Sequence, residues 1–422
     1  MARIAVAVSG GVDSLCALCR LREEGHDPLA LHGLFLPSVD TETTAGGVLP
    51  SGGLPLSAAA DAPRLWHVPT AGESTPTPLA PDMPPGLTDA GLAAVSPALP
   101  GLRAACRRLG VPLYLLDARQ RFAQAVVAPF VRAYAQGRTP NPCALCNASI
   151  KFGVLLDAAR QLSAVTLATG HYARCAVHPS TGQRLLVPAT DAQKDQAYFL
   201  ALVPPDALQH VLFPLAELTK QDCRALVAAA GLDVPVPGES QEICFIPAGE
   251  DAYRDFLGRR WAAEGIPPPP GGPVLLRTPD GERPIARHDG LWRYTEGQRR
   301  GLGIAHSEPL YVLGKDVARQ ALLVGGRALL GMRACRTGPA NLFLPDMAAR
   351  LSSSGDGAPL FVRLRYRQRP VPANVRLLPD GGLHIRLDAA HGPHFPSAPG
   401  QIAAVYDAAG RLLAGAVIEA VV

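Results

Sequence analysis

The order of apolar and polar positions divides the chain into an N-terminal α/β part and a β-rich C-terminal part. A short apolar run at 4–8 predicts a strand, residues 14–24 predict a helix that stops at Gly25, and 28–36 predict a second strand. Strands that alternate with helices are typical of a parallel sheet covered by helices. We therefore expect a doubly wound α/β domain at the N-terminus.

This alternation stops between residues 38 and 100, where eleven prolines occur among many Gly, Ser, Thr and Ala residues. We expect a surface insertion there, largely disordered or loosely packed. The α/β pattern then resumes and continues to about residue 207. The expected helices are 102–109, 123–136 and 150–162, and the expected strands are 112–116 and 164–168.

The remaining chain changes character. Residues 206–245 are expected to be helical, with a helix start at Leu218-Thr219-Lys220 and a stop at Gly231. After a proline-rich break at 266–273, short β-type segments separated by turns run to the C-terminus. We expect three parts: an α/β domain at 1–207, a small central domain at 208–322 and a C-terminal β-barrel at 323–422.

Composition narrows the cellular setting. No apolar run reaches the length of a membrane span, and the first residues do not form a signal peptide, so a cytoplasmic protein without membrane contact is expected. The nine cysteines are then expected to be mostly reduced. The net charge of +4 says little about partners. Only four of the 40 basic residues are Lys, which leaves 36 Arg, a side chain suited to phosphate recognition.

The first strand leads into Ser9-Gly10-Gly11-Val12-Asp13-Ser14 and then a helix. Glycines let the backbone approach an anion closely, and the amides at a helix N-terminus attract negative charge. The loop lacks the Gly-Lys-Ser/Thr ending of a P-loop. It resembles the pyrophosphate loop of the ATP pyrophosphatase family, whose members cleave ATP to AMP and pyrophosphate, and that resemblance assigns Asp13 to Mg²⁺. A glycine-rich turn before an ordinary helix is the alternative.

Two cysteine segments carry candidate chemistry. In Thr139-Pro140-Asn141-Pro142-Cys143-Ala144-Leu145-Cys146-Asn147, Cys146 is expected just before a helix, whose N-terminus would stabilise a thiolate. A structural zinc site would need more ligands, and the chain has no second Cys-x-x-Cys. Cys244 lies in an apolar segment and alone indicates little more than a core position. ATP activation of an oxygen combined with two reactive cysteines is, however, what sulfur transfer requires.

With further motifs the chain resembles the tRNA-specific 2-thiouridylase family from end to end, except for residues 38–100. Besides the loop and the cysteine segment, the matching motifs are Gly170-His171-Tyr172-Ala173-Arg174, Lys194-Asp195-Gln196-x-Tyr198-Phe199-Leu200, Ile243-Cys244-Phe245-Ile246, Tyr294-Thr295-x-Gly297-Gln298-Arg299-x-Gly301-Leu302-Gly303, Arg365-Tyr366-Arg367-Gln368 and Pro399-Gly400-Gln401.

The resemblance implies ATP-dependent conversion of the 2-oxo group of the wobble uridine to 2-thio, in tRNAs for Lys, Glu and Gln. It implies a sulfur donor protein, either a cysteine desulfurase or a relay protein, and a monomer. Cys244 would hold a persulfide and Cys146 would be the partnering nucleophile. The residues implied for ATP are Ala7, Val8, Ser9, Gly10, Gly11, Val12, Asp13, Ser14, Leu36 and Gly170. Those implied for the target base are Asn141, Pro142 and Cys143. Those implied for tRNA are His171, Lys194, Asp195, Gln196, Arg365, Tyr366 and Gln401.

One position departs from the family pattern. Cys143 stands where the best-studied version of the motif has Asp, and a thiol is a poor substitute for a carboxylate in acid–base work. The departure creates Cys143-x-x-Cys146, which with Cys244 offers three thiolates. Two hypotheses follow: the three cysteines hold a labile iron–sulfur cluster, or the pair is redox-active.

The C-terminal part contains a basic segment. Arg363, Arg365, Arg367 and Arg369 alternate along an expected strand and would form a stripe on one face. With Tyr366 they would suit phosphate contact and base stacking, whereas a solvated strand face is the alternative.

Two other functions of the whole protein remain open: a C–N-forming ligase of the same fold, and a tRNA-binding protein that has lost catalysis.

Overall fold

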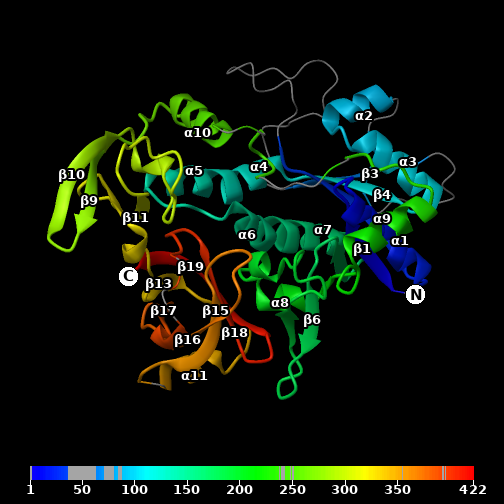
Figure 1. Cartoon of the computed structure of the whole chain (residues 1–422). Helices are drawn as coiled ribbons and strands as arrows, with labels where there is room; N and C mark the ends of the chain where they lie inside the picture. The colour runs from blue at the N-terminus through cyan, green and yellow to red at the C-terminus, as the bar shows by residue number, and fades with distance from the viewer. Residues whose placement is uncertain are drawn as a thin grey trace. The chain divides into compact units, whose positions relative to one another are not determined.

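The computed structural model describes residues 2–36, 63–70, 80–83, 88–236, 238, 243–247, 249, 251–353, 355–391, 394 and 396–422. Residues 38–62, 71–79 and 84–87 of the expected insertion lie outside the described residues. The chain divides into two compact units, one of residues 1–126 with 145–241 and one of 127–144 with 242–422. In Figure 1 the colour follows the residue number through both units.

A six-stranded sheet forms the centre of the first unit, with the strand order β3-β4-β2-β1-β5-β8. All neighbouring strands are parallel except β3 and β4. The predicted doubly wound parallel sheet is confirmed. The strands are β1 (Arg3–Ala7), β2 (Asp27–Leu34), β3 (Arg64–Val68), β4 (Leu113–Asp117), β5 (Thr166–Thr169) and β8 (Val211–Leu212), and a separate hairpin pairs β6 (Arg174–Val177) with β7 (Arg184–Val187).

The expectation of an insertion without regular structure at 38–100 was wrong for its described parts. Strand β3 pairs antiparallel with β4, with Leu65 opposite Leu116. Helix α2 (Asp89–Val95) begins after Thr88, whose hydroxyl accepts a hydrogen bond from Gly91 N–H, and α3 starts at Leu99. An edge strand pairs with only one neighbour, so five residues are enough to form β3. A segment this short, between prolines and glycines, shows too little alternation of apolar and polar residues to predict a strand.

Helices cover this sheet, and α1 packs against α9 (Figure 1). Leu15, Cys16 and Leu18 of α1 are fully buried, as is Cys223 of α9. The predicted start of α9 is confirmed, because Thr219 and Asp222 form a capping box. Besides α2, the helices of this unit are α1 (Val12–Glu23), α3 (Leu99–Leu109), α4 (Arg119–Phe122), α7 (Leu155–Gln161), α8 (Pro205–Leu208) and α9 (Lys220–Ala229).

Two long helical stretches contain π-helical turns. One comprises α4, the π-helical segment Ala123–Val127 and α5 (Ala128–Ala135). The other comprises α6 (Pro142–Cys146), the π-helical segment Asn147–Val154 and α7. The second stretch was expected to begin at residue 150. It begins at Pro142, a residue whose missing N–H and fixed φ suit the first helical turn.

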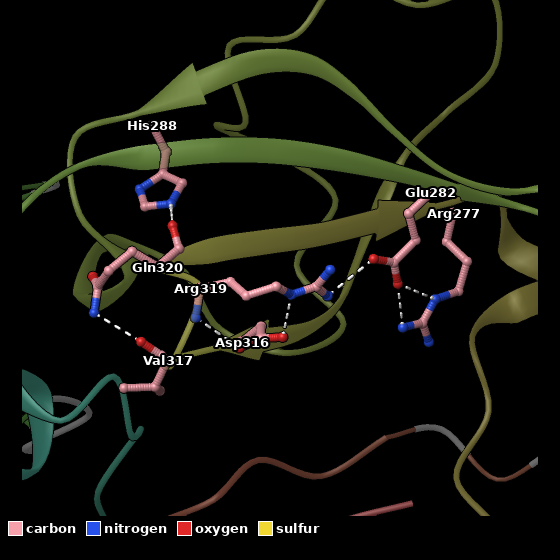
Figure 2. Close-up of polar contacts among 7 residues, drawn as sticks. All are labelled: Arg277, Glu282, His288, Asp316, Val317, Arg319 and Gln320. Atoms are coloured by element: carbon pink, nitrogen blue, oxygen red, sulfur yellow. Dashed lines mark hydrogen bonds and ion pairs between the residues drawn. The ribbon is translucent and has the colours of Figure 1, made fainter.

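In the second unit, a four-stranded sheet has the order β10-β9-β12-β11. The strands are β9 (Gly272–Thr278), β10 (Gly281–His288), β11 (Tyr311–Asp316) and β12 (Ala321–Gly325). Val274, Val312, Leu322 and Val324 form its core. On the exposed side Arg319 bridges Asp316 and Glu282, and Glu282 also binds Arg277 (Figure 2). Such exposed ion pairs contribute little to stability.

The C-terminal sheet closes into a barrel, as predicted, because β13 pairs with both β17 and β19. Its strands follow the order β13-β17-β16-β15-β18-β19-β14. They are β13 (Ala334–Pro339), β14 (Asn341–Leu342), β15 (Ala358–Arg363), β16 (Val371–Leu377), β17 (Gly382–Leu387), β18 (Ile402–Tyr406) and β19 (Leu412–Val421), and the unit's other helices are α10 (Ala252–Ala263) and α11 (Met347–Ser353).

The predicted arginine stripe was wrong. Strand β15 ends at Arg363, whose side chain is buried, and residues 365–367 form a turn. Arg367 has a φ of 62° there, and the Gln368 carboxamide oxygen accepts the Leu364 N–H across the turn. Alternating arginines lie on one face only while the backbone stays extended.

Candidate active site

The ends of two neighbouring strands bring the predicted ATP loop and Gly170 together. Strands β1 and β5 are parallel, and Ala7 at the end of β1 is opposite Thr169 at the end of β5. The chain order of the sheet reverses at this point, with β2 on one side of β1 and β5 on the other. Ligands of open α/β sheets bind outside the carboxyl ends of strands at such a reversal. The loop at 9–14 therefore lies where this fold places a ligand.

The loop itself is closed by local hydrogen bonds. The Ser14 hydroxyl donates to Gly11 O at 2.8 Å and accepts from Ser9 N–H at 3.2 Å. Gly10 has a φ of 87°, a conformation that favours glycine. A Cβ atom on Gly170 would lie 2.9 Å from both Asp13 C and Ser14 N, so only glycine allows β5 to approach the loop this closely. The loop backbone is thereby held against the N-terminus of α1.

Asp13 is the central charged group of this site. Lys220 Nζ lies 2.8 Å from each of its carboxylate oxygens, and the Tyr172 hydroxyl donates to Oδ1 at 2.9 Å. Burial raises the pKa of Tyr172, so this group stays a neutral donor. Sequence reasoning recognised Thr219-Lys220 only as a helix start. The lysine comes to Asp13 because α9 packs against α1, which no local pattern indicates.

Three residues that the resemblance assigned to tRNA make contacts inside the first unit. The ring of buried His171 bonds Thr169 Oγ1 through Nδ1 at 2.8 Å and Lys151 Nζ through Nε2 at 3.3 Å. An ammonium group only donates, so Nε2 accepts and Nδ1 carries the proton. Buried Asp195 accepts the backbone N–H groups of residues 189 and 197, and the Gln196 carboxamide oxygen accepts that of Tyr172. These side chains support the segment around Tyr172.

His171 gives a pH-dependent prediction. Burial, with Lys151 nearby, holds the pKa of His171 well below its ordinary 6.5. Below pH 6.5 the unfolded chain therefore takes up a proton at His171 that the folded chain does not. The contribution of His171 to the free energy of unfolding is highest above pH 6.5 and decreases as the pH falls. In His171→Gln we expect the slope of unfolding free energy against pH, between about pH 5 and 6.5, to be smaller by up to about 1.4 kcal/mol per pH unit. Urea unfolding at several pH values measures it, and equal slopes would contradict it.

The cysteine segment differs from expectation in one respect. Asn141 caps α6, because its carboxamide oxygen accepts the Ala144 N–H at 3.2 Å. Cys143 is exposed in the first turn, and buried Cys146 is the last residue of α6 instead of preceding the helix. A spacing of three residues puts both thiols on the same side of a helix. Asn141 and Pro142 occupy the start of the same helix.

Cys244 is exposed in a turn of the second unit. The following residue, Phe245, packs edge-on against Phe130 at 5.2 Å and also contacts Phe256 at 5.5 Å between ring centroids. These aromatic contacts anchor the turn in which the exposed Cys244 lies. Within the described ranges, no three His, Cys, Asp or Glu side chains gather as metal ligands. The iron–sulfur cluster and the redox-active Cys143–Cys146 pair both stay hypotheses.

The remaining predicted residues lie in several settings. Leu36 follows β2 and is 40% exposed. Arg365 donates to Pro396 O at 3.3 Å, and the Arg367 guanidinium lies 5.4 Å from the ring centre of Tyr366. Gln401 donates to Thr139 O at 2.9 Å, at the first residue of the cysteine segment.

In the described part of the chain, no helix combines the length and the apolar character needed to span a membrane.

Three family models match the chain. They are described as a tRNA methyl transferase HUP domain at residues 92–248, a tRNA methyl transferase PRC-barrel domain at 270–326 and an aminomethyltransferase β-barrel domain at 350–418. Their order agrees with an α/β unit, a small central sheet and a closed barrel.

Full-length relatives are named more specifically. A protein of Nitratidesulfovibrio vulgaris strain Miyazaki F, named tRNA-specific 2-thiouridylase MnmA, is 44% identical over 418 residues, with 99% of each chain covered. Proteins of the same name from Oleidesulfovibrio alaskensis and Lawsonia intracellularis are 44% identical over 423 residues and 36% identical over 420 residues, covering 99% and 98% of both chains. The chain therefore belongs to the tRNA-specific 2-thiouridylase family.

Proposed function

We propose that this protein replaces the 2-oxo group of the wobble uridine of tRNA by sulfur, with ATP converted to AMP and pyrophosphate. The observation that carries the proposal is the 44% identity, over 99% of both chains, to a relative named for this activity. The loop at the β1–β5 reversal supports its ATP requirement. A ligase of the same fold would have no need for the two cysteine segments.

ATP would bind at the Ser9–Ser14 loop, with its phosphates facing the loop amides and the N-terminus of α1. Gly170 would allow close approach, and Leu36 would contact the nucleoside. The Asp13 carboxylate, 33% exposed, fits the Mg²⁺ that accompanies ATP, since carboxylate oxygen is the ligand Mg²⁺ prefers. The Mg²⁺ would neutralise charge that develops on the phosphates.

The target uridine would be held by Asn141, Pro142 and Cys143 at the start of α6. We propose that His171, Lys194, Asp195, Gln196, Arg365, Tyr366 and Gln401 lie along the tRNA path, in tRNAs for Lys, Glu and Gln. For His171, Asp195, Gln196 and Gln401 the internal contacts favour support of that path over direct binding.

Sulfur transfer would begin when uridine O2 attacks the α-phosphorus of ATP and pyrophosphate leaves. A cysteine desulfurase or a relay protein would supply the terminal sulfur of a Cys244 persulfide. In one route this sulfur attacks C2 and AMP leaves; the Cys146 thiolate then attacks Cys244 Sγ, which releases the 2-thio group and forms a disulfide. In the other, Cys146 attacks the persulfide first and releases sulfide, which displaces AMP. Both routes leave a disulfide that a thiol must reduce.

The test is reconstitution of the whole protein with ATP, Mg²⁺, tRNA, cysteine, a cysteine desulfurase and a thiol reductant. We expect 2-thiouridine in the nucleoside digest, with AMP and pyrophosphate formed in proportion to it. Parallel reactions with S-adenosylmethionine in place of the sulfur source address the methyl transfer named in two model descriptions. A methylated uridine there, or no 2-thiouridine in the complete reaction, would overturn the proposal.

A further inference from the structure

The residues just before Asn141 are bound from the C-terminal barrel. Thr139 N–H donates to Pro399 O at 2.8 Å, and Gln401 Nε2 donates to Thr139 O at 2.9 Å. A Cβ atom on Gly400 would lie 2.7 Å from Thr139 O, so glycine is required for the two segments to come this close. The backbone of Thr139 is therefore fixed on both its N–H and its C=O side by one short segment.

The same threonine is contacted from the central sheet region through its side chain. Thr139 Oγ1 lies 3.4 Å from Thr295 Oγ1 and accepts from Lys315 Nζ at 3.4 Å. Lys315 forms an ion pair with Glu296 at 3.5 Å, and their side chains are only 2% and 3% exposed. Thr295 belongs to the Tyr294–Gly303 motif, and Glu296 occupies the unspecified position that follows it.

A buried ion pair is costly to keep. Burial raises the pKa of Glu296 and lowers the pKa of Lys315, and each partner opposes the shift of the other. Replacing such a pair by apolar residues is often neutral or stabilising, so stability alone is a weak explanation for its presence. Here the ammonium group is directed at the residue that precedes the α6 cap by two positions. A positional role for this pair accounts for that geometry.

We propose that Gln401, Lys315 and Glu296 are positioning residues that clamp Thr139 and thereby fix Asn141 and Cys143 for the target base, an inference that rests on the proposed function. The clamp joins Thr139 to the barrel through its backbone and to the central region through its hydroxyl. Gln401 acts here through its hydrogen bond to Thr139 O, in place of the tRNA contact that the resemblance implies.

Two variants of the whole protein test the clamp. Gln401→Met keeps side-chain length but cannot donate to Thr139 O. The double variant Glu296→Gln with Lys315→Met removes both charges together, because removing one would leave the other buried without compensation. Arg319→Met is the matched control, since it removes two exposed ion pairs of the same sheet, those with Glu282 and Asp316 (Figure 2).

Hydrogen exchange of peptides covering 139–147 and steady-state thiolation are then measured. In both clamp variants we expect exchange to be faster by about tenfold and kcat to fall by about 10- to 100-fold, with the KM for tRNA within about twofold of wild type. The control should match wild type in all three. Unchanged exchange would overturn the clamp, and a higher KM for tRNA at constant kcat would make Gln401 a tRNA contact. If wild type makes no 2-thiouridine, the proposed function fails while the exchange data still judge the clamp.

Discussion

Cys244→Ser is expected to lower 2-thiouridine formation by at least about 1,000-fold, the scale on which loss of a covalent nucleophile acts. A serine hydroxyl cannot carry the persulfide sulfur, and its higher pKa makes it a poor nucleophile at neutral pH. The side chain is exposed in a turn anchored by Phe245, so the substitution removes one sulfur atom without opening a core cavity. Binding of tRNA should stay within about twofold of wild type, because serine is close to cysteine in size and the ring contacts of Phe245 stay in place.

A matched variant and a direct measurement separate this role from general damage. Cys175→Ser changes a cysteine of strand β6 outside the motifs and should retain wild-type thiolation. Cys146→Ser should also lose thiolation yet still accumulate a persulfide on the Cys244 peptide, which mass spectrometry detects after incubation with the desulfurase and cysteine. Sustained thiolation by Cys244→Ser would show that Cys244 does not carry the persulfide. Absence of persulfide in both wild type and Cys146→Ser would do the same.

The sheet of the first unit could be predicted because its inner strands carry their own signal. Strands β1 and β2 are buried on both faces and appear in the sequence as continuous apolar runs. Strand β3 pairs only at the edge, and its residues Arg64 and Trp66 are only half-buried, so it carried too little signal. The prediction for the arginines after β15 was wrong for another reason. Their alternation predicts a strand, but the chain turns at Arg367, which has a positive φ.

The site shows the same division between local and distant causes. The Ser9–Ser14 loop and Cys143-x-x-Cys146 are contiguous in sequence, so their chemistry was visible there. Lys220 lies 207 residues from Asp13 along the chain, and Lys315 lies 176 residues from Thr139. The packing of α9 on α1 brings Lys220 to Asp13, and the buried ion pair with Glu296 holds Lys315 near Thr139. Lysines are rare in this chain, four in all, and two of them contact the site in this way.

Asp13→Asn is expected to lower ATP conversion to AMP by about 100- to 1,000-fold, the cost of losing a group that stabilises developing charge in a reaction centre. The amide keeps the shape of the carboxylate and can still accept the Tyr172 hydroxyl, so the loop should fold as before. It loses the negative charge that holds Lys220 and that would hold Mg²⁺. Measuring AMP and pyrophosphate release with saturating tRNA quantifies the effect.

The neighbouring acid of α9 provides the control, because Asp222→Asn makes the same chemical change without facing the loop. Asp222 bonds Thr219 in the capping box, and its replacement should lower the stability of the protein slightly with ATP conversion unchanged. Raising Mg²⁺ should not restore Asp13→Asn, since an amide oxygen carries no charge with which to offset that of the metal. ATP conversion by Asp13→Asn within about threefold of wild type would show that the loop binds ATP without this carboxylate. The 2.8 Å contacts of Lys220 with Asp13 would then be a structural ion pair that only happens to lie beside the loop.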